Sequence, residues 1–87
     1  MYYVYVVFCG RKKKLYYGFT NNLKRRMSEH RNNRRPYSFT RNEDLELVYY
    51  EAHINEEDAR DRERFFKTGW GRNYIRKILR NYFSKIK

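Results

Sequence analysis

The sequence predicts a small domain of the α/β class, of the α+β type, in which a three-stranded antiparallel sheet is flanked by helices in the order β-β-α-β-α-α. The chain contains three segments rich in β-branched and aromatic residues and three segments of helical pattern, which follow one another in this order. The chain has 87 residues, which is enough for one domain and too few for two. We therefore expect residues 1–87 to form a single domain.

The first two predicted strands form a hairpin. Residues 2–8, YYVYVVF, are β-branched or aromatic throughout, which predicts a strand covered on both faces. Residues 15–19, LYYGF, form the second strand after the charged turn GRKKK, and so short a connection favours antiparallel pairing. Gly18 inside this strand indicates either a bulge or a close approach of another group to the backbone.

The first helix is predicted over residues 23–31, after a polar cap at one of residues 20–22. Leu23 and Met27 are four residues apart, so both face the core. The long basic segment 32–44 that follows is expected to be a DNA-facing or mobile loop.

The C-terminal half predicts one strand and two helices. Residues 45–51, LELVYYE, alternate and are β-prone, which predicts the third strand. Asn55 offers an N-cap for a helix over residues 56–67, and the glycines of TGWG, residues 68–71, are expected to end it. A stripe of apolar residues at spacings of three and four predicts the last helix over residues 73–83.

The charge balance points to a polyanionic partner. The chain carries 21 Lys and Arg against 10 Asp and Glu, a net charge of +11. Nucleic acid, and DNA first, is the expected partner ahead of an anionic membrane, because no long apolar run or clean basic amphipathic helix is present. The residues expected to contact the nucleic-acid backbone are Lys12, Lys13, Lys14, Arg25, Arg31, Arg34 and Arg35.

The N-terminal segment MYYVYVVFCG lacks a basic region ahead of its short apolar run, so we interpret it as a strand rather than a secretory signal. An intracellular location, in the cytoplasm or nucleoid, is expected. Cys9 is the only cysteine, which excludes an internal disulfide and a cysteine-based zinc cluster.

Two tyrosines on the predicted hairpin are candidates for chemistry. Strand alternation places Tyr5 on the same face as Tyr3 and Val7, and pairing of the hairpin brings the Tyr16 hydroxyl to the same side. Gly18, on the face of Tyr16, leaves room for a ligand. The alternative is that both are amphipathic tyrosines of the core or surface, in a chain that has ten of them.

The first helix carries a basic pair at the border between core and solvent. Arg26 and His30 are four residues apart and lie one above the other. The guanidinium suits a phosphate held by two hydrogen bonds, and the imidazole could move a proton. The alternative is an ordinary solvated basic face.

Glu63 lies on the apolar face of the second helix, with Ala59 and Phe66. A carboxylate there needs a partner, because an unpaired buried charge is costly. The partner is either Arg62 or Arg26 in a salt bridge, or a divalent cation, which oxygen ligands suit.

Together these residues resemble the GIY-YIG nuclease family, and especially its short single-domain predicted endonucleases. YVY at residues 3–5 and YYG at residues 16–18 stand where the two signature triplets would be. Arg26, His30 and Glu63 follow in the order of the family's arginine, histidine and metal-binding glutamate. The resemblance covers nearly the whole chain. Tyr3, Val4 and Tyr17 depart from the signature but leave its tyrosines in place.

The resemblance implies hydrolysis of a DNA phosphodiester with one Mg²⁺ or Mn²⁺ ion held by Glu63, as in DNA repair or recombination. Tyr5 or Tyr16 would orient the attacking water, Arg26 would stabilise the phosphate, and His30 would assist proton transfer or hold phosphate. Asn73 is the candidate for the family's C-terminal asparagine, at a shorter spacing from Glu63 than the family usually has.

The sequence is also compatible with two other functions. A non-catalytic nucleic-acid-binding module with a degenerate nuclease fold would have the same charge and aromatic content, and a small interaction or membrane-surface protein is a more distant alternative. Because the sequence offers no separate recognition domain, we expect low sequence specificity, selectivity for DNA structure, or a targeting protein partner. The sequence does not indicate an oligomeric state.

Overall fold

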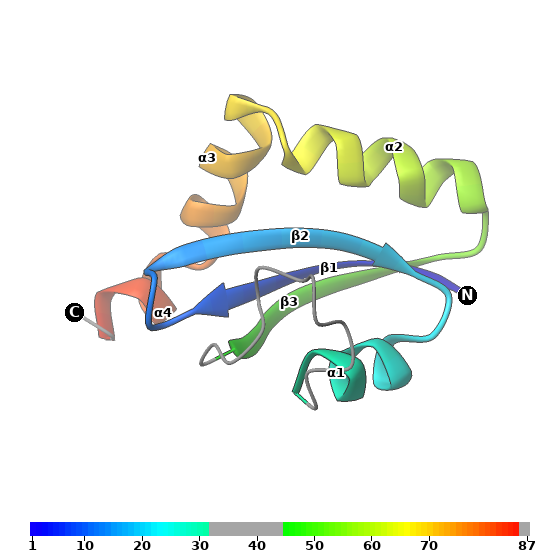
Figure 1. The fold of residues 1–87 in the computed structure, drawn as a ribbon. Coiled ribbons are helices and arrows are strands. Elements are labelled where there is room, and N and C mark those ends of the chain that lie inside the picture. The colour runs from blue at the N-terminus through cyan, green and yellow to red at the C-terminus, as the bar shows by residue number, and fades with distance from the viewer. Residues whose placement is uncertain (32–44, 86–87) are drawn as a thin grey trace.

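The computed structural model describes residues 1–31 and 45–85 of the chain (Figure 1). The predicted order of elements is confirmed, with the last predicted helix observed as two. The elements are β1 (Tyr2–Cys9), β2 (Lys14–Thr20), α1 (Leu23–Arg31), β3 (Leu45–His53), α2 (Glu56–Phe66), α3 (Gly69–Ile78) and α4 (Arg80–Lys85). The predicted loop over residues 32–44, with Arg34 and Arg35, lies outside the described residues.

The three strands form one antiparallel sheet in the order β2-β1-β3, with β1 in the centre. In this register Tyr5 lies opposite Gly18 on β2 and opposite Tyr50 on β3. The sheet bulges where Val6 and Val7 pair with β3, so Val48 is the extra residue there. The glycine of β2 therefore does not mark the bulge but a close approach.

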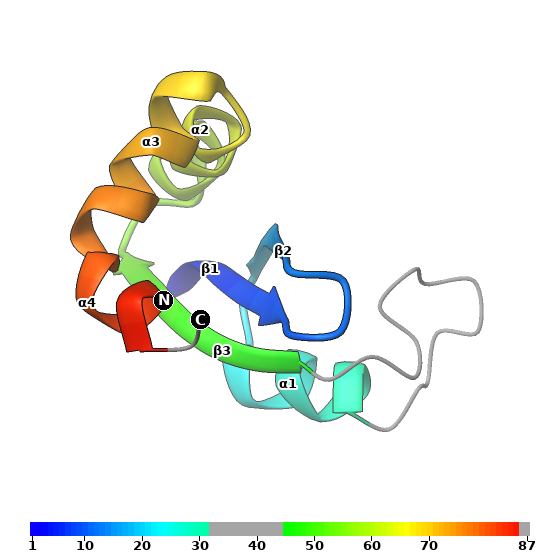
Figure 2. The ribbon, with the colours of Figure 1, turned by 90° about the vertical axis from the view of Figure 1, so that its left-hand side faces the viewer.

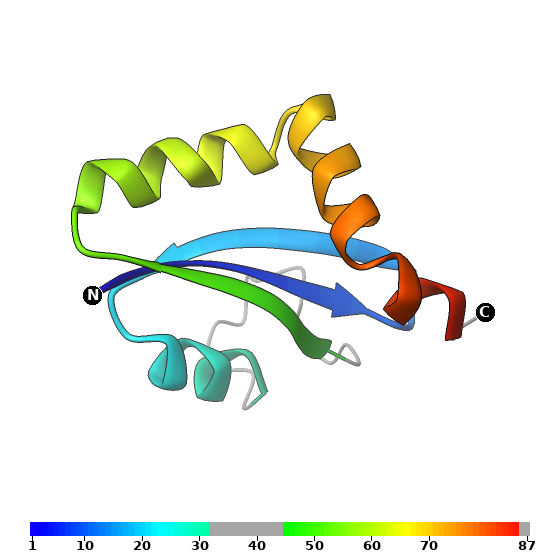
Figure 3. The ribbon, with the colours of Figure 1, turned by 180° about the vertical axis from the view of Figure 1, so that it is seen from behind.

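Helices cover the two faces of the sheet separately. Figures 1 and 3 show α2 and α3 on one face and α1 on the other, and Figure 2 shows the sheet between them. Side chains of β1 point alternately to the two faces of the sheet and so contribute to a hydrophobic core on each face. Val4 and Val6 pack under α2 and α3, whereas Tyr5 and Val7 pack against Met27 of α1. The predicted core side of α1 is confirmed.

The start of α3 differs from the prediction, because Gly69 and Gly71 do not end α2 but lie in the first turn of the next helix. Thr68 caps that helix, and its Oγ1 accepts a hydrogen bond from the Gly71 backbone N–H at 3.1 Å. A Cβ at Gly71 would lie 2.0 Å from the Phe65 carbonyl oxygen. Glycine is thus needed for the close contact between two helices, which the sequence alone does not show.

The predicted N-cap of α2 is confirmed. The Asn55 side-chain oxygen accepts hydrogen bonds from the backbone N–H groups of Glu57 and Asp58, at 2.8 and 3.2 Å. In the part of the chain that the structure describes, no helix is long and apolar enough to cross a membrane.

Candidate active site

The Tyr5 ring lies directly over the backbone of Gly18. A Cβ built on Gly18 would lie 2.3 Å from both Cζ and the hydroxyl oxygen of Tyr5. Any side chain at residue 18 would therefore displace the ring. The glycine lets a side chain from the central strand reach across β2, which is an edge strand. The Tyr5 residue is only 4% exposed, so its ring is held in place by the surrounding core.

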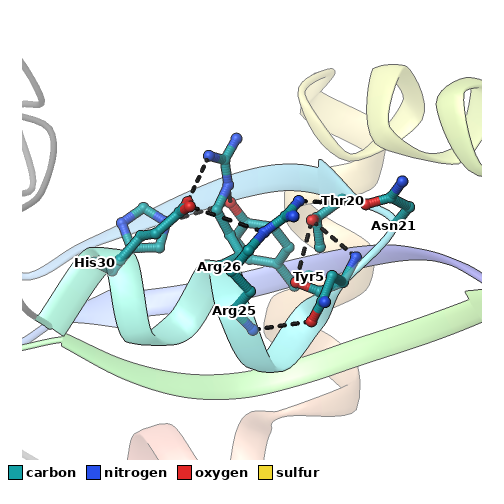
Figure 4. A network of polar contacts seen from close by, with 8 residues as sticks. Tyr5, Thr20, Asn21, Arg25, Arg26 and His30 are labelled. Carbon is teal, nitrogen blue, oxygen red and sulfur yellow. Dashed lines mark hydrogen bonds and ion pairs between the residues drawn. The ribbon is translucent and has the colours of Figure 1, made fainter.

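The Tyr5 hydroxyl meets two side chains of α1 (Figure 4). Arg26 Nε donates a hydrogen bond to it at 3.2 Å, and His30 Nε2 lies 3.3 Å from it. The tyrosine and histidine rings meet edge to face, with centroids 6.0 Å apart. The structure thus brings together three of the predicted site residues, in one hydrogen-bonded cluster that we call the Tyr5–Arg26–His30 cluster.

Arg26 also has a carboxylate partner on its own helix. Its Nη1 lies 3.3 Å from Glu29 Oε1, and Arg25 Nε lies 3.8 Å from the other oxygen of the same carboxylate. Burial of the guanidinium opposes its charge, but interactions with Tyr5 and Glu29 outweigh burial and raise the pKa of Arg26 above its ordinary value. Arg26 therefore stays positively charged, and a quarter of its side chain is open to solvent.

The turn between β2 and α1 fixes where this helix begins. Thr20 is buried, and its Oγ1 accepts a hydrogen bond from the Asn22 backbone N–H at 3.1 Å. The Asn22 side chain in turn accepts from the Arg25 backbone N–H at 3.0 Å, as an N-cap does. These local contacts set the first turn of α1, and with it the position of Arg26 one turn from the cap.

Tyr16 lies on the same face of the sheet as Tyr5, as the alternation predicts. It pairs with Val7 and packs against the cluster of Tyr5, Val7 and Met27. The side chain is partly buried, so it is both a core residue and accessible from solvent.

Glu63 comes to the sheet from the other side, on α2 (Figure 1). Its side chain is 21% exposed, and Oε2 accepts a hydrogen bond from Lys67 Nζ at 3.1 Å. The predicted salt bridge to Arg62 or Arg26 is wrong, because Arg62 pairs with Glu51 and Arg26 with Glu29. Among the described residues, Glu63 makes no hydrogen bond or ion pair with the Tyr5–Arg26–His30 cluster.

Helices α1 and α2 nevertheless border one hollow at the end of β2. This hollow, of about 390 Å³, is lined by Phe19 and Thr20 of β2, by Arg26 and Glu29 of α1, and by Glu56 and Arg60 of α2. The Arg60 guanidinium lies 4.2 Å from the centre of the Phe19 ring. Glu63 follows Arg60 by about one turn of α2.

The other predicted site residues are distributed more widely. Lys12 and Lys13 are exposed in the turn between β1 and β2, Lys14 is exposed at the start of β2, and Arg25 is exposed on α1. Arg31 is the last residue of α1. Asn73 is exposed in α3, on the far side of the sheet from α1.

Two features were missed in the sequence. Glu29 pairs with Arg25 and Arg26 of α1, and its spacing of three from Arg26 was the signal. Glu51 on β3 binds Arg62 of α2 through both carboxylate oxygens, at 2.9 and 3.0 Å, and also accepts from the Tyr49 hydroxyl. No local pattern in the sequence indicates this pair, because β3 and α2 come into contact only when the chain folds.

A tyrosine from the central strand, a charged arginine and a histidine thus lie together beside a glycine of the edge strand. The model of the GIY-YIG catalytic domain matches residues 1–76, and the chain belongs to this family of nucleases. The predicted family is thereby confirmed.

Similar chains occur in several bacteria. The sequence is 39% identical over 69 residues to a UPF0213 protein of Pediococcus acidilactici, which covers 76% of this chain and 68% of the relative. It is 38% identical over 82 residues to a UPF0213 protein of Clostridium perfringens, covering 93% of this chain and 76% of the relative. No solved structure matches the chain.

Proposed function

We propose that this protein is a metal-dependent endonuclease that hydrolyses DNA phosphodiester bonds, with low sequence specificity or with selectivity for DNA structure. The observation that supports this most strongly is the Tyr5–Arg26–His30 cluster over Gly18. Membership of the GIY-YIG family and the net charge of +11 support the same substrate.

Each member of the cluster has a role in the proposed reaction. Arg26, charged and partly open to solvent, binds the scissile phosphate and stabilises the additional negative charge of the transition state. Tyr5, beside this charge, orients the attacking water and, as the phenolate left when its own proton passes to the His30 imidazole, accepts the proton of that water. Tyr16 is the second candidate for this role. His30, 3.3 Å from the Tyr5 hydroxyl, moves the proton onward or holds phosphate.

The proposed metal ligand fits Mg²⁺ or Mn²⁺ by its chemistry. Nucleases of this family generally depend on a divalent metal, and a carboxylate oxygen such as that of Glu63 is a hard ligand. Among the described residues, no group of three or more acidic, histidine or cysteine side chains is placed to hold a metal ion together. Mg²⁺ is commonly bound through one or two carboxylates, with water and substrate phosphate as its other ligands. When bound, the metal would neutralise charge developing on the leaving oxygen.

Lys67 Nζ donates a hydrogen bond to the Glu63 carboxylate in the structure, and this bond must break when a metal cation binds there. The bond is easily exchanged, because more than half of the Lys67 side chain is exposed and surface ion pairs are weak. Lys67 would then be free to contact the DNA backbone.

The test is cleavage of supercoiled plasmid and of branched DNA with Mg²⁺ or Mn²⁺. We expect nicking that EDTA abolishes and that Glu63→Gln and Arg26→Gln each lower by about a hundredfold or more, with DNA binding retained for Glu63→Gln. Glu57→Gln on the exposed side of α2 and Lys24→Gln on α1 are the matched controls and should cut at near the wild-type rate.

Cleavage that survives EDTA, or that Glu63→Gln leaves unchanged, would overturn the metal site. A wild type that binds DNA but cuts neither substrate with either metal would contradict the enzyme and leave a nucleic-acid-binding module.

A further inference from the structure

A second cavity lies at the other end of the sheet, beside the turn between β1 and β2. Its volume is about 640 Å³, within the range of roughly 300–1,000 Å³ for small-ligand sites. It is framed by Phe8 and Tyr17 of the hairpin and by α3 and α4, which cross this end of the sheet in Figure 3. The hollow beside Arg26 is at the opposite end of β2.

Four cations line this cavity, and they come from two distant parts of the sequence. Lys13 belongs to the turn and Lys14 begins β2, whereas Arg72 and Arg76 are one turn apart on α3. No acidic side chain among the described residues pairs with any of the four. Their positive charge therefore stays available for an anionic ligand.

Aromatic rings form the wall beside these cations. Phe8, Tyr82 and Phe83 are in mutual contact, with ring centroids 5.3 to 6.2 Å apart. The Tyr82 hydroxyl donates to Glu46 at 2.6 Å, which fixes the ring and also engages the one carboxylate that lines the cavity. Burial raises the pKa of Tyr17 above its ordinary value against the opposing charges of Arg72 and Arg76, so the phenol is neutral and both arginines lie near it.

The backbone at Lys13 is strained. Its φ is 55°, in the left-handed region, where glycine or asparagine is favoured over a long side chain. Either of those residues would ease the turn but would remove a cation from the rim of the cavity. Such strain concentrates at binding sites.

We propose that this cavity binds one unpaired nucleotide of a nucleic-acid strand, with the base against the aromatic wall and the adjoining phosphates on the four cations. The inference rests on the proposed function and extends it. A strand held here at one end of β2, with the Tyr5–Arg26–His30 cluster toward the other end, would favour substrates that contain single-stranded DNA. Stacking a base on aromatic side chains stabilises binding whatever the base, which agrees with low sequence specificity.

The test is the affinity for fluorescein-labelled oligonucleotides, measured by anisotropy in EDTA so that no cleavage occurs. The probes are a single-stranded dT decamer, an abasic decamer with the same phosphates, and a duplex. The wild type should bind the dT decamer about tenfold or more tightly than the abasic one, because stacking requires a base. A 2-aminopurine base placed in the decamer should be quenched in the complex.

The test variant is Arg72→Gln with Arg76→Gln, and the matched control is Lys77→Gln with Arg80→Gln, two exposed cations of α3 and α4 that do not line the cavity. The test variant should bind the dT decamer about tenfold more weakly. Its plot of log affinity against log salt should be shallower by about 1.4, since each phosphate contact on a single strand contributes about 0.7. The control should lose far less affinity, and circular dichroism should show both variants folded.

Equal affinity for the dT and abasic decamers would overturn the proposal, as would equal losses in the test and control variants. Binding of free dTMP as tight as that of the decamer would identify a free nucleotide as the ligand and overturn the strand-binding proposal. Because binding is measured without metal, a protein that cuts no DNA can still pass this test, and an active nuclease can fail it.

Discussion

At the scale of the residue, the close contact between Tyr5 and Gly18 is the main support for an active site. The tyrosine is buried at 4% exposure, yet its hydroxyl lies within hydrogen-bonding distance of Arg26 and His30. A core tyrosine needs only one partner for its hydroxyl. Here two ionisable side chains meet the hydroxyl, and the ring lies over a strand residue that has no side chain, which supports the proposed catalytic role.

Gly18→Ala tests this contact. The added Cβ would lie 2.3 Å from the Tyr5 ring, so the ring must move and its hydroxyl must leave Arg26 and His30. Overpacking of this kind destabilises by about 1–3 kcal/mol, and displacement of a reacting group by about 1 Å can lower the rate by about a hundredfold. Thermal unfolding and the single-turnover cleavage rate measure the two effects.

Gly69→Ala is the matched control, because a Cβ at Gly69 meets nothing within 4 Å. Its stability should be unchanged or slightly higher, since alanine is the better helix former. If Gly18→Ala behaved like Gly69→Ala in both measurements, the close contact would have no functional meaning.

At the scale of the element, the pairing of Glu51 with Arg62 joins β3 to α2, which carries Glu63. Both carboxylate oxygens bind the guanidinium, and the Tyr49 hydroxyl adds a third bond at 2.8 Å. Burial disfavours the Glu51 charge, but hydrogen bonds from Arg62 and Tyr49 outweigh burial and lower the pKa of Glu51 below its usual 4.5. Burial and the bond to Glu51 raise the pKa of Tyr49 to about 12.

These shifts predict how stability depends on pH. Because the folded pKa of Glu51 is lowered, its contribution to stability is present above pH 4.5 and is lost as pH falls below that value. Because the folded pKa of Tyr49 is raised, its contribution is present below pH 10 and is lost as pH rises toward about 12. Denaturant unfolding between pH 3 and 11 should show both losses.

Glu51→Gln should reduce the loss of stability in acid and lower stability at neutral pH, because Arg62 loses its partner. Glu57→Gln, an exposed residue on α2, is the control and should follow the wild-type curve. If Glu51→Gln lost as much stability in acid as the wild type, other carboxylates would be the main cause of that loss.

Local patterns predicted most of these elements, whereas tertiary contacts decided what was missed. The strands, α1 and the Asn55 cap follow from alternation, spacing and capping chemistry. The start of α3 was missed because Gly71 serves a contact with the Phe65 carbonyl, which belongs to another helix. The pairing of Glu63 with Lys67 has helical spacing and was open to prediction, unlike that of Glu51 with Arg62.

At the scale of the whole molecule, two concave regions lie at the two ends of β2. The sequence predicted Arg26, which lines the first region, together with its neighbours Tyr5 and His30, because their order and spacing resemble those of the GIY-YIG family. It could not predict the second, whose cations come from residues 13–14 and 72–76 and are brought together only by the packing of α3 and α4. Among the described residues, cations therefore lie at both ends of β2.

The most direct test of the central claim is the single-turnover cleavage rate of Tyr5→Phe at saturating protein, with Tyr50→Phe as its matched control. Tyr5→Phe removes one oxygen and keeps the ring, whereas Tyr50 lies opposite Tyr5 in the sheet and is 52% exposed. We predict that Tyr5→Phe cuts about a hundredfold or more slowly than the wild type with unchanged DNA affinity, whereas Tyr50→Phe cuts normally. A Tyr5→Phe variant as fast as the wild type would contradict the assignment of this cluster as the active site.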